Sequence, residues 1–192
     1  MPKRGDVFRK DHYYHIYNRS IRDEKLFFNT NNYDYCLNLM KRYSERFEMS
    51  IIAYCLMPNH YHFLIQQRSH HPISSFVGSL FNAYVQAVNK SQDRKGPLFE
   101  NRFKHILIDK EEYLIHLCRY IHLNPVEAGL VSRPEEWLFS NYLEWVNLRA
   151  GDLKDEEFIN DRFQDVQEYQ TFVNTSKHEE INRSTLMRYI MD

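Results

Sequence analysis

The stretch Tyr54-Cys-Leu-Met-Pro-Asn-His-Tyr-His-Phe-Leu-Ile-Gln66 carries the pattern that decides the fold. Apolar runs flank Pro58-Asn59, a pair typical of a turn, so the stretch is predicted to form a tight β-hairpin. His60 and His62 stand two residues apart in the second strand and should face the same side of a sheet. Both imidazoles can then reach one metal ion or one phosphate.

The segments around this hairpin predict the element order β-α-β-β-α-β-α. They comprise a strand over 12–20, a helix of about 16 residues from Asn29-Thr30, strands over 50–57 and from His60, a helix over 73–89, a strand over 102–108 and a helix from about Lys110. Asn124-Pro125 is expected to end the last helix, because the α region is disfavoured before proline.

The first six of these elements match the split βαβ, ferredoxin-like pattern. We therefore predict an α+β fold, ferredoxin-like or RRM-like, with a four-stranded antiparallel sheet and two helices on one face. The helix after the last strand is expected near the other, active face. Residues 1–145 are predicted to form this domain, and 146–192 an acidic helical extension packed on or near it, because its aromatic residues recur near helical spacing.

Charge divides unevenly along the chain. Residues before Pro134 carry a net charge of +6 and the remainder −7, which agrees with the overall −1. A basic body with an acidic tail is compatible with binding a polyanion, although two solvated surfaces of opposite bias would look the same.

The three cysteines are widely spaced, which argues against a disulfide framework and favours a reducing compartment. Without an apolar run of about 18 residues or a signal-like start, we expect a cytoplasmic protein with no membrane segment.

A second cluster of polar side chains lies on the last core helix. Tyr120 and Asn124 are four residues apart and share one helix face, which His116 extends by a turn. A tyrosine hydroxyl beside two metal-holding histidines would supply a nucleophile and an electrophilic activator, so that Tyr120 could attack a scissile phosphate. The amide oxygen of Asn124 is a suitable third ligand for a hard cation beside His60 and His62.

Other interpretations fit these residues individually. The two histidines could be hydrogen-bonded core residues of a half-buried strand, and Tyr120 could be one of many structural tyrosines among the 14 in the chain. His116 and His122 are expected to be surface or packing residues more often than catalytic ones. The same holds for His15, although the first strand could bring it to the edge of the site. A metal hydrolase or structural metal protein would need a carboxylate or another histidine as third ligand, because asparagine is a poor zinc ligand.

Four motifs, in order, carry a family resemblance. They are Tyr14-His-Ile-Tyr-Asn-Arg19, Met57-Pro-Asn-His-Tyr-His62, Gly96-Pro-Leu-Phe-Glu-Asn-Arg-Phe-Lys104 and Trp137-Leu-Phe-Ser-Asn-Tyr142. His60-Tyr61-His62 resembles the His-hydrophobic-His signature of HUH endonucleases, and Arg119-Tyr-Ile-His-Leu-Asn-Pro-Val126 resembles the nucleophile helix of their single-tyrosine, IS200-like transposases. The chain is most similar to the REP-associated tyrosine transposases.

The resemblance implies a Mg or Mn dependent nuclease and strand transferase acting on single-stranded DNA beside a hairpin, through a 5′-phosphotyrosine intermediate. By motif position, Tyr120 would be the nucleophile, and His60, His62 and Asn124 the metal ligands, where relatives can have glutamine at the last position. A regulatory DNA-binding protein of the same fold that has lost cleavage stays open. Replication initiators and relaxases share the signature but are usually longer.

Basic residues near the motifs are candidate contacts to DNA phosphates: Arg19, Lys95, Arg102, Lys104 and Arg119. The recognised DNA sequence does not follow from the chain, because base readout depends on few side chains and on DNA shape. Single-tyrosine transposases often exchange the nucleophile helix across a dimer, but the acidic extension could cover the partner's surface. A monomer is therefore favoured over a homodimer.

Overall fold

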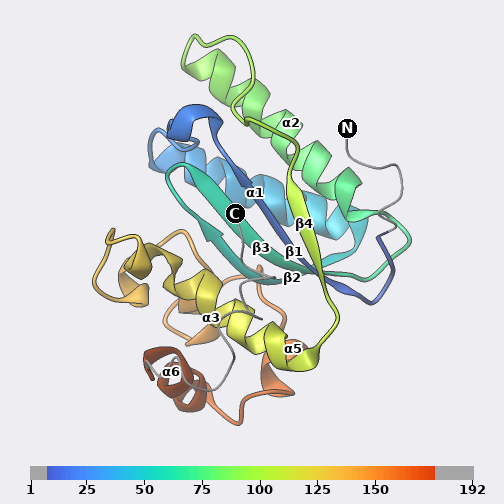
Figure 1. Cartoon of the computed structure of the whole chain (residues 1–192), viewed down its shortest axis with the longest axis vertical. Coiled ribbons are helices and arrows are strands. Elements are labelled where there is room, and N and C mark those ends of the chain that lie inside the picture. The colour runs from blue at the N-terminus through green and yellow to red at the C-terminus, as the bar shows by residue number, and fades with distance from the viewer. Residues whose placement is uncertain (1–7, 176–192) are drawn as a thin grey trace.

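The structure is a computed structural model that describes residues 8–175. Its centre is a four-stranded antiparallel sheet in the order β2-β3-β1-β4 (Figure 1). The strands are β1 (Tyr13–Arg19), β2 (Met49–Leu56), β3 (His60–Gln67) and β4 (Lys104–Ile108). This order is the one that the ferredoxin-like pattern requires, so the predicted fold class is confirmed.

Two helices cover one face of the sheet. Helix α1 (Thr30–Phe47) begins where predicted, because the Asn29 side chain accepts a hydrogen bond from the backbone N–H of Asn32. Helix α2 (Ile73–Ser91) packs beside α1. Both helices share a hydrophobic core with alternate residues of the central strands, among them Ile16 of β1 and Phe63 of β3. These side chains follow the period of two that a strand imposes.

The opposite face of the sheet is covered by α3 (Glu111–Glu127) and the C-terminal segment. The helices of this segment are α4 (Tyr142–Trp145), α5 (Glu156–Asn160) and α6 (Val166–Asn174), and they lie on the same side of the sheet as α3 (Figure 1). Buried aromatic residues of the segment share a core with α3: Tyr142, Trp145, Phe158, Phe163 and Tyr169. The boundary at 145/146 stays a prediction, and 176–192 lie outside the described residues.

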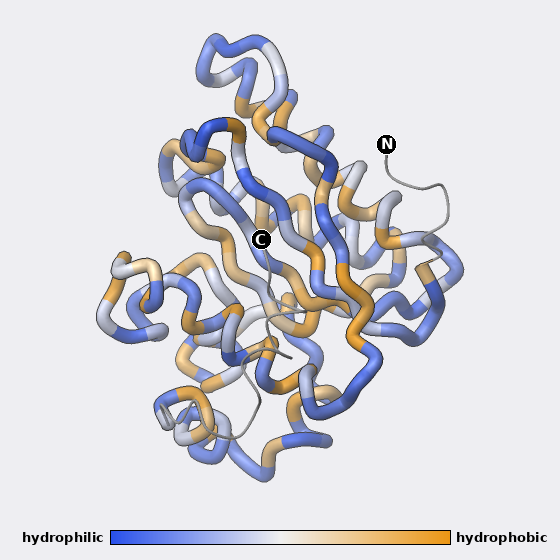
Figure 2. The backbone as a smooth tube through the Cα atoms, in the orientation of Figure 1, coloured by the Kyte–Doolittle hydropathy of each residue, from blue (hydrophilic) through white to orange (hydrophobic). Residues whose placement is uncertain are grey.

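Hydropathy follows this layering. Apolar residues gather along the strands and the inner sides of the helices, whereas the turn between α2 and β4 is hydrophilic (Figure 2). The polar composition of 89–97 predicts a loop there, but α2 continues to Ser91 and only residues 92–97 of this segment lie in the turn. None of the helices between residues 8 and 175 combines the length and the apolar character that a membrane span requires.

The predicted end of the last core helix is wrong. Helix α3 continues through Pro125 to Glu127. A proline lacks the N–H that would bond to the carbonyl four residues back, but it leaves its own carbonyl free to accept. The carbonyls of Asn124 and Pro125 still accept the N–H groups of Ala128 and Leu130, at 3.0 and 2.9 Å. The helix stops instead before Gly129, whose φ of 67° is in the left-handed region that favours glycine.

A buried polar network fixes α3 to its surroundings. His122 of α3 is fully buried, with Nδ1 2.6 Å from the hydroxyl of Tyr169 and Nε2 2.9 Å from Oδ1 of Asn141. The Asn141 side chain also bonds the β2 backbone: Oδ1 accepts from Tyr54 N, and Nδ2 donates to Ile52 O. The prediction that His122 serves packing is confirmed. The network joins α3, α6 and the sheet.

Burial lowers the pKa of His122 to about 4. Between pH 6.5 and 4 the unfolded imidazole therefore binds a proton that the folded one does not, so the free energy of unfolding falls as the pH falls. At most, this residue contributes about 3 kcal/mol above pH 6.5 that is lost by pH 4. Urea unfolding across this range should show a shallower pH dependence for His122→Gln than for the wild type. Parallel curves would contradict the assignment.

Candidate active site

The two histidines of the hairpin lie at the start of β3, on the face of the sheet that α3 covers. The β1-β3 register pairs His60 with Arg19 and His62 with Tyr17, which places both histidines beside the end of β1. The rings of His60 and His62 lie 5.2 Å apart between centroids. Tyr61 between them points to the opposite face and packs on Phe81, as the alternation predicts.

His62 is buried and its two ring nitrogens differ. Its Nδ1 lies 2.9 Å from Nε2 of His15, whereas its Nε2, also buried, has no hydrogen-bond partner among residues 8–175. Burial, reinforced by the neighbouring His15 and His60, holds the pKa of His62 well below its ordinary value. The ring is therefore neutral at pH 7, the state in which an imidazole nitrogen can ligate a metal.

His60 is half-buried, and each of its ring nitrogens lies near an amide oxygen. Nδ1 is 2.7 Å from Oδ1 of Asn59, and Nε2 is 3.1 Å from Oδ1 of Asn124. Both oxygens accept, so a neutral ring donates to one of them only. Donation of Nδ1–H to Asn59, the shorter contact, is the arrangement that leaves the Nε2 lone pair beside Asn124 for a cation.

Helix α3 brings Tyr120 and Asn124 to the histidines. The ring of Tyr120 meets that of His62 edge to face, with centroids 5.5 Å apart, and Asn124 one turn later reaches His60. The structure therefore gathers all four residues predicted for catalysis and metal binding: His60, His62, Tyr120 and Asn124. His116 does not join them, because its ring packs on Phe172 at a centroid distance of 5.0 Å.

These donors fit a small hard cation. Ligands about 2.1 Å from an octahedral ion and at right angles to each other lie about 3 Å apart, close to the 3.1 Å between His60 Nε2 and Asn124 Oδ1. The unpartnered Nε2 of His62 offers a further ligand. Within residues 8–175 no group of three or more His, Cys, Asp or Glu side chains could hold a metal.

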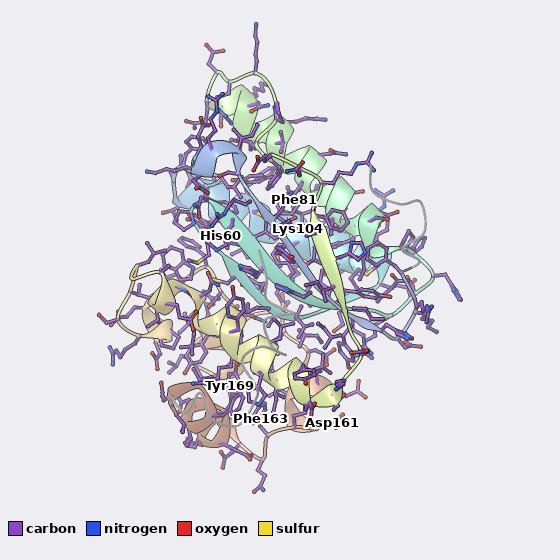
Figure 3. The ribbon with its side chains drawn as sticks, in the orientation of Figure 1. His60, Phe81, Lys104, Asp161, Phe163 and Tyr169 are labelled. Carbon is purple, nitrogen blue, oxygen red and sulfur yellow. The ribbon has the colours of Figure 1, made fainter. Side chains whose placement is uncertain are left out.

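Three of the candidate DNA contacts lie at the same end of the sheet as His60. Arg19 ends β1 opposite His60 and pairs with Asp23 at 3.3 Å. Lys104 begins β4 opposite Tyr17, with Nζ 5.4 Å from the centre of that ring, and Arg102 precedes it on the surface. Figure 3 shows His60 and Lys104 near this end. The three cations border the site.

The other two candidates lie elsewhere. Lys95 is exposed in the turn after α2. Arg119 turns toward the C-terminal segment: its guanidinium donates to the carbonyls of Val173 and Thr175, at 3.2 and 2.7 Å, and stacks over Phe172. Arg119 thus holds the end of α6 against α3. The position of Arg119 on its helix does not predict these contacts, because they depend on how α6 packs against α3.

Two further residues, His15 and Asn59, contact the histidines of the site, each within hydrogen-bond distance of a histidine Nδ1. The sequence predicts a turn at Asn59 and allows His15 no more than a place at the edge of the site. The alternation Tyr13, His15, Tyr17 places His15 on the same face of β1 as its neighbours two residues away. Only the pairing register shows which of these residues reaches His62.

Comparison with known proteins relates the chain to DNA transposases. A protein of Haemophilus influenzae named as a candidate REP-associated tyrosine transposase is 24% identical over 113 residues, which cover 53% of this chain and 64% of that protein. The chain thus spans less than two thirds of that relative. A solved REP-associated tyrosine transposase bound to a REP hairpin has the same fold, with a TM-score of 0.66, 20% identity, and coverage of 81% of this chain and 94% of that one.

The family comparison covers the core of the domain. Residues 8–124 match the family described as "Transposase IS200 like", a range that includes all four strands and ends at Asn124. His60, His62, Tyr120 and Asn124 all fall within it. Because the match extends over more than half of the chain, this protein belongs to the IS200-like transposase family.

Proposed function

We propose that this protein is a divalent-metal-dependent endonuclease and strand transferase that acts on single-stranded DNA at hairpin-associated sites. The observation that carries the proposal is the edge-to-face contact of Tyr120 with His62, beside His60 and Asn124. This arrangement combines one nucleophile with nitrogen and oxygen donors that face one another. Membership in the IS200-like transposase family supports it.

Tyr120 is the proposed nucleophile. Its oxygen attacks the scissile phosphate, a P–O bond to the tyrosine forms, and the bond to the 3′ oxygen of the upstream strand breaks. The phenol loses its proton and the departing 3′ oxygen gains one, so that a free 3′-hydroxyl and a 5′-phosphotyrosine result. Attack by the liberated or another 3′-hydroxyl reverses these steps and joins strands.

His60, His62 and Asn124 are the proposed ligands of a Mg or Mn ion. When bound, the cation would polarise a phosphate oxygen and favour attack by a tyrosine whose ordinary pKa is near 10. Asn59 lies within hydrogen-bond distance of Nδ1 of His60, so that Nε2 of this ring can serve the cation. The carbonyl oxygen of Asn124 is a donor of the kind that Mg and Mn bind.

The substrate is proposed to be a hairpin with an adjoining single strand. The structural neighbour with the same fold was solved with a REP hairpin, and Arg19, Arg102 and Lys104 border the site. Their cations would hold phosphates of the backbone. We propose a monomer, because Arg119 and His122 fasten the nucleophile helix to α6 and its C-terminal end in the same chain. We propose a cytoplasmic location as well.

Incubation with a library of hairpin-bearing single-stranded DNA tests this function. Cleavage is expected with Mn or Mg and should be absent with EDTA, because the proposed step needs a cation to polarise the scissile phosphate. The matched control is a hairpin library without single-stranded flanks. If the protein shifted the DNA on a gel but cut it with neither metal, a regulatory DNA-binding protein would be favoured instead. If the protein neither bound nor cut the DNA, the nuclease proposal would be refuted and the metal-protein interpretation would be open again.

A further inference from the structure

His15 lies at the back of the proposed metal site and has no role in the function described so far. It is fully buried in the middle of β1, and its Nε2 is 2.9 Å from Nδ1 of His62. In the β1-β3 register His15 pairs with Leu64, two residues beyond His62, so the two rings meet diagonally across the strands. They stack at a centroid distance of 5.2 Å.

This contact fixes where a neutral His62 carries its proton. If the proton were on Nε2, a buried N–H would have no acceptor, because Nε2 has no partner among the described residues. If the proton is on Nδ1, it is donated to His15 and the lone pair remains on Nε2. We infer that His15 is a positioning residue, which accepts the Nδ1–H of His62 and so presents the Nε2 lone pair to the cation.

The surroundings of His15 suit this role. Tyr17 stacks on it at 4.8 Å and on His62 at 5.9 Å, so the three rings form one stack on the face of the sheet beneath α3. A stacked ring in a strand has little rotational freedom, and the acceptor is therefore held in place before any ligand binds. His15 Nε2 is engaged by His62 and is not itself offered to the cation.

The inference rests on the proposed function for its purpose, but its first test needs neither metal nor DNA. In ¹⁵N-histidine-labelled protein without metal, long-range ¹H–¹⁵N spectra report which nitrogen of each ring is protonated. The His62 signals are assigned by their loss in His62→Gln. We expect the Nδ1–H tautomer in the wild type. An Nε2–H tautomer would overturn the inference whatever the protein's activity.

The second test compares His15→Leu with His15→Gln. Leucine removes the acceptor, whereas glutamine can place an amide oxygen near the ε position of the lost ring. Mn²⁺ binding, followed by the electron paramagnetic resonance of the free ion, should weaken about 10- to 100-fold in His15→Leu, as for other partners of metal-bound histidines, and recover in His15→Gln. Equal affinity in wild type and both variants would overturn the inference.

His122→Gln is the matched control, because His122 is an equally buried, hydrogen-bonded histidine that makes none of these contacts. It should leave the His62 tautomer and the Mn²⁺ affinity unchanged. If it lowered the affinity as much as His15→Leu, loss of any buried histidine would explain the effect and the inference would fail. A wild type with the Nδ1–H tautomer but no Mn²⁺ binding would refute the proposed metal site while leaving the hydrogen-bond assignment intact.

Discussion

Tyr120→Phe is expected to lower the rate of DNA strand cleavage by on the order of 10⁴-fold or more, because it removes the only atom proposed to attack the phosphate. The ring itself stays, and with it the edge-to-face packing on His62 at 5.5 Å. Folding, metal binding and DNA binding should therefore be unchanged. Single-turnover kinetics with enzyme in excess over DNA measure the chemical step, and a gel-shift titration measures binding separately.

Tyr113→Phe provides the matched control, since it removes a hydroxyl from the same helix at a buried residue of the α3 core. Cleavage by this variant should stay within a few-fold of the wild type. If Tyr120→Phe still cut DNA at a rate near that of Tyr113→Phe, the nucleophile would be another group, such as a water molecule, and the tyrosine mechanism would be refuted.

His60→Ala carries the second large effect. It removes one nitrogen ligand, and the proposed site then retains only His62 and Asn124, so cleavage at a fixed low metal concentration should fall on the order of 10³-fold. His60 is half-buried at the first position of β3, which makes the substitution less disruptive to the core than one at buried His62. Titrating Mn²⁺ should show a shift of the activity curve to higher concentration.

His116→Ala is the control for this variant, because the ring of His116 packs on Phe172 of α6. Its activity curve should overlay that of the wild type. A His60→Ala protein with unchanged metal dependence would show that the histidine serves the strand structure and not a cation.

Much of the fold could be predicted from local patterns. The turn at Pro58-Asn59, the cap at Asn29 and the helix starts all depend on residues close in sequence, and the structure confirms them within one or two positions. The pairing of His60 with His62 and of Tyr120 with Asn124 likewise follows from the periods of a strand and a helix. Each pair stands on one element, so that no tertiary contact was needed to predict it.

What could not be predicted depends on contacts between distant segments. His15 and His62 are 47 positions apart in sequence, and the strand register brings them together. The guanidinium of Arg119 donates to a carbonyl 56 positions further along the chain. The place of Arg119 beside Tyr120 in sequence does not predict this contact. Local preference predicts a helix stop at Asn124-Pro125, whereas α3 continues to Glu127 and the carbonyl of Pro125 accepts a hydrogen bond from Leu130 N.

The polarity of the covalent intermediate distinguishes tyrosine attack from every other mechanism. A hairpin substrate labelled at its 3′ end and one labelled at its 5′ end would each be incubated with protein and Mn²⁺, and adducts recovered for peptide mass spectrometry. We expect that only the 3′-labelled DNA becomes attached, through a 5′-phosphate on Tyr120, while the 5′-labelled fragment leaves with a free 3′-hydroxyl. Attachment to any other residue, or cleavage with no adduct at any time, would contradict it.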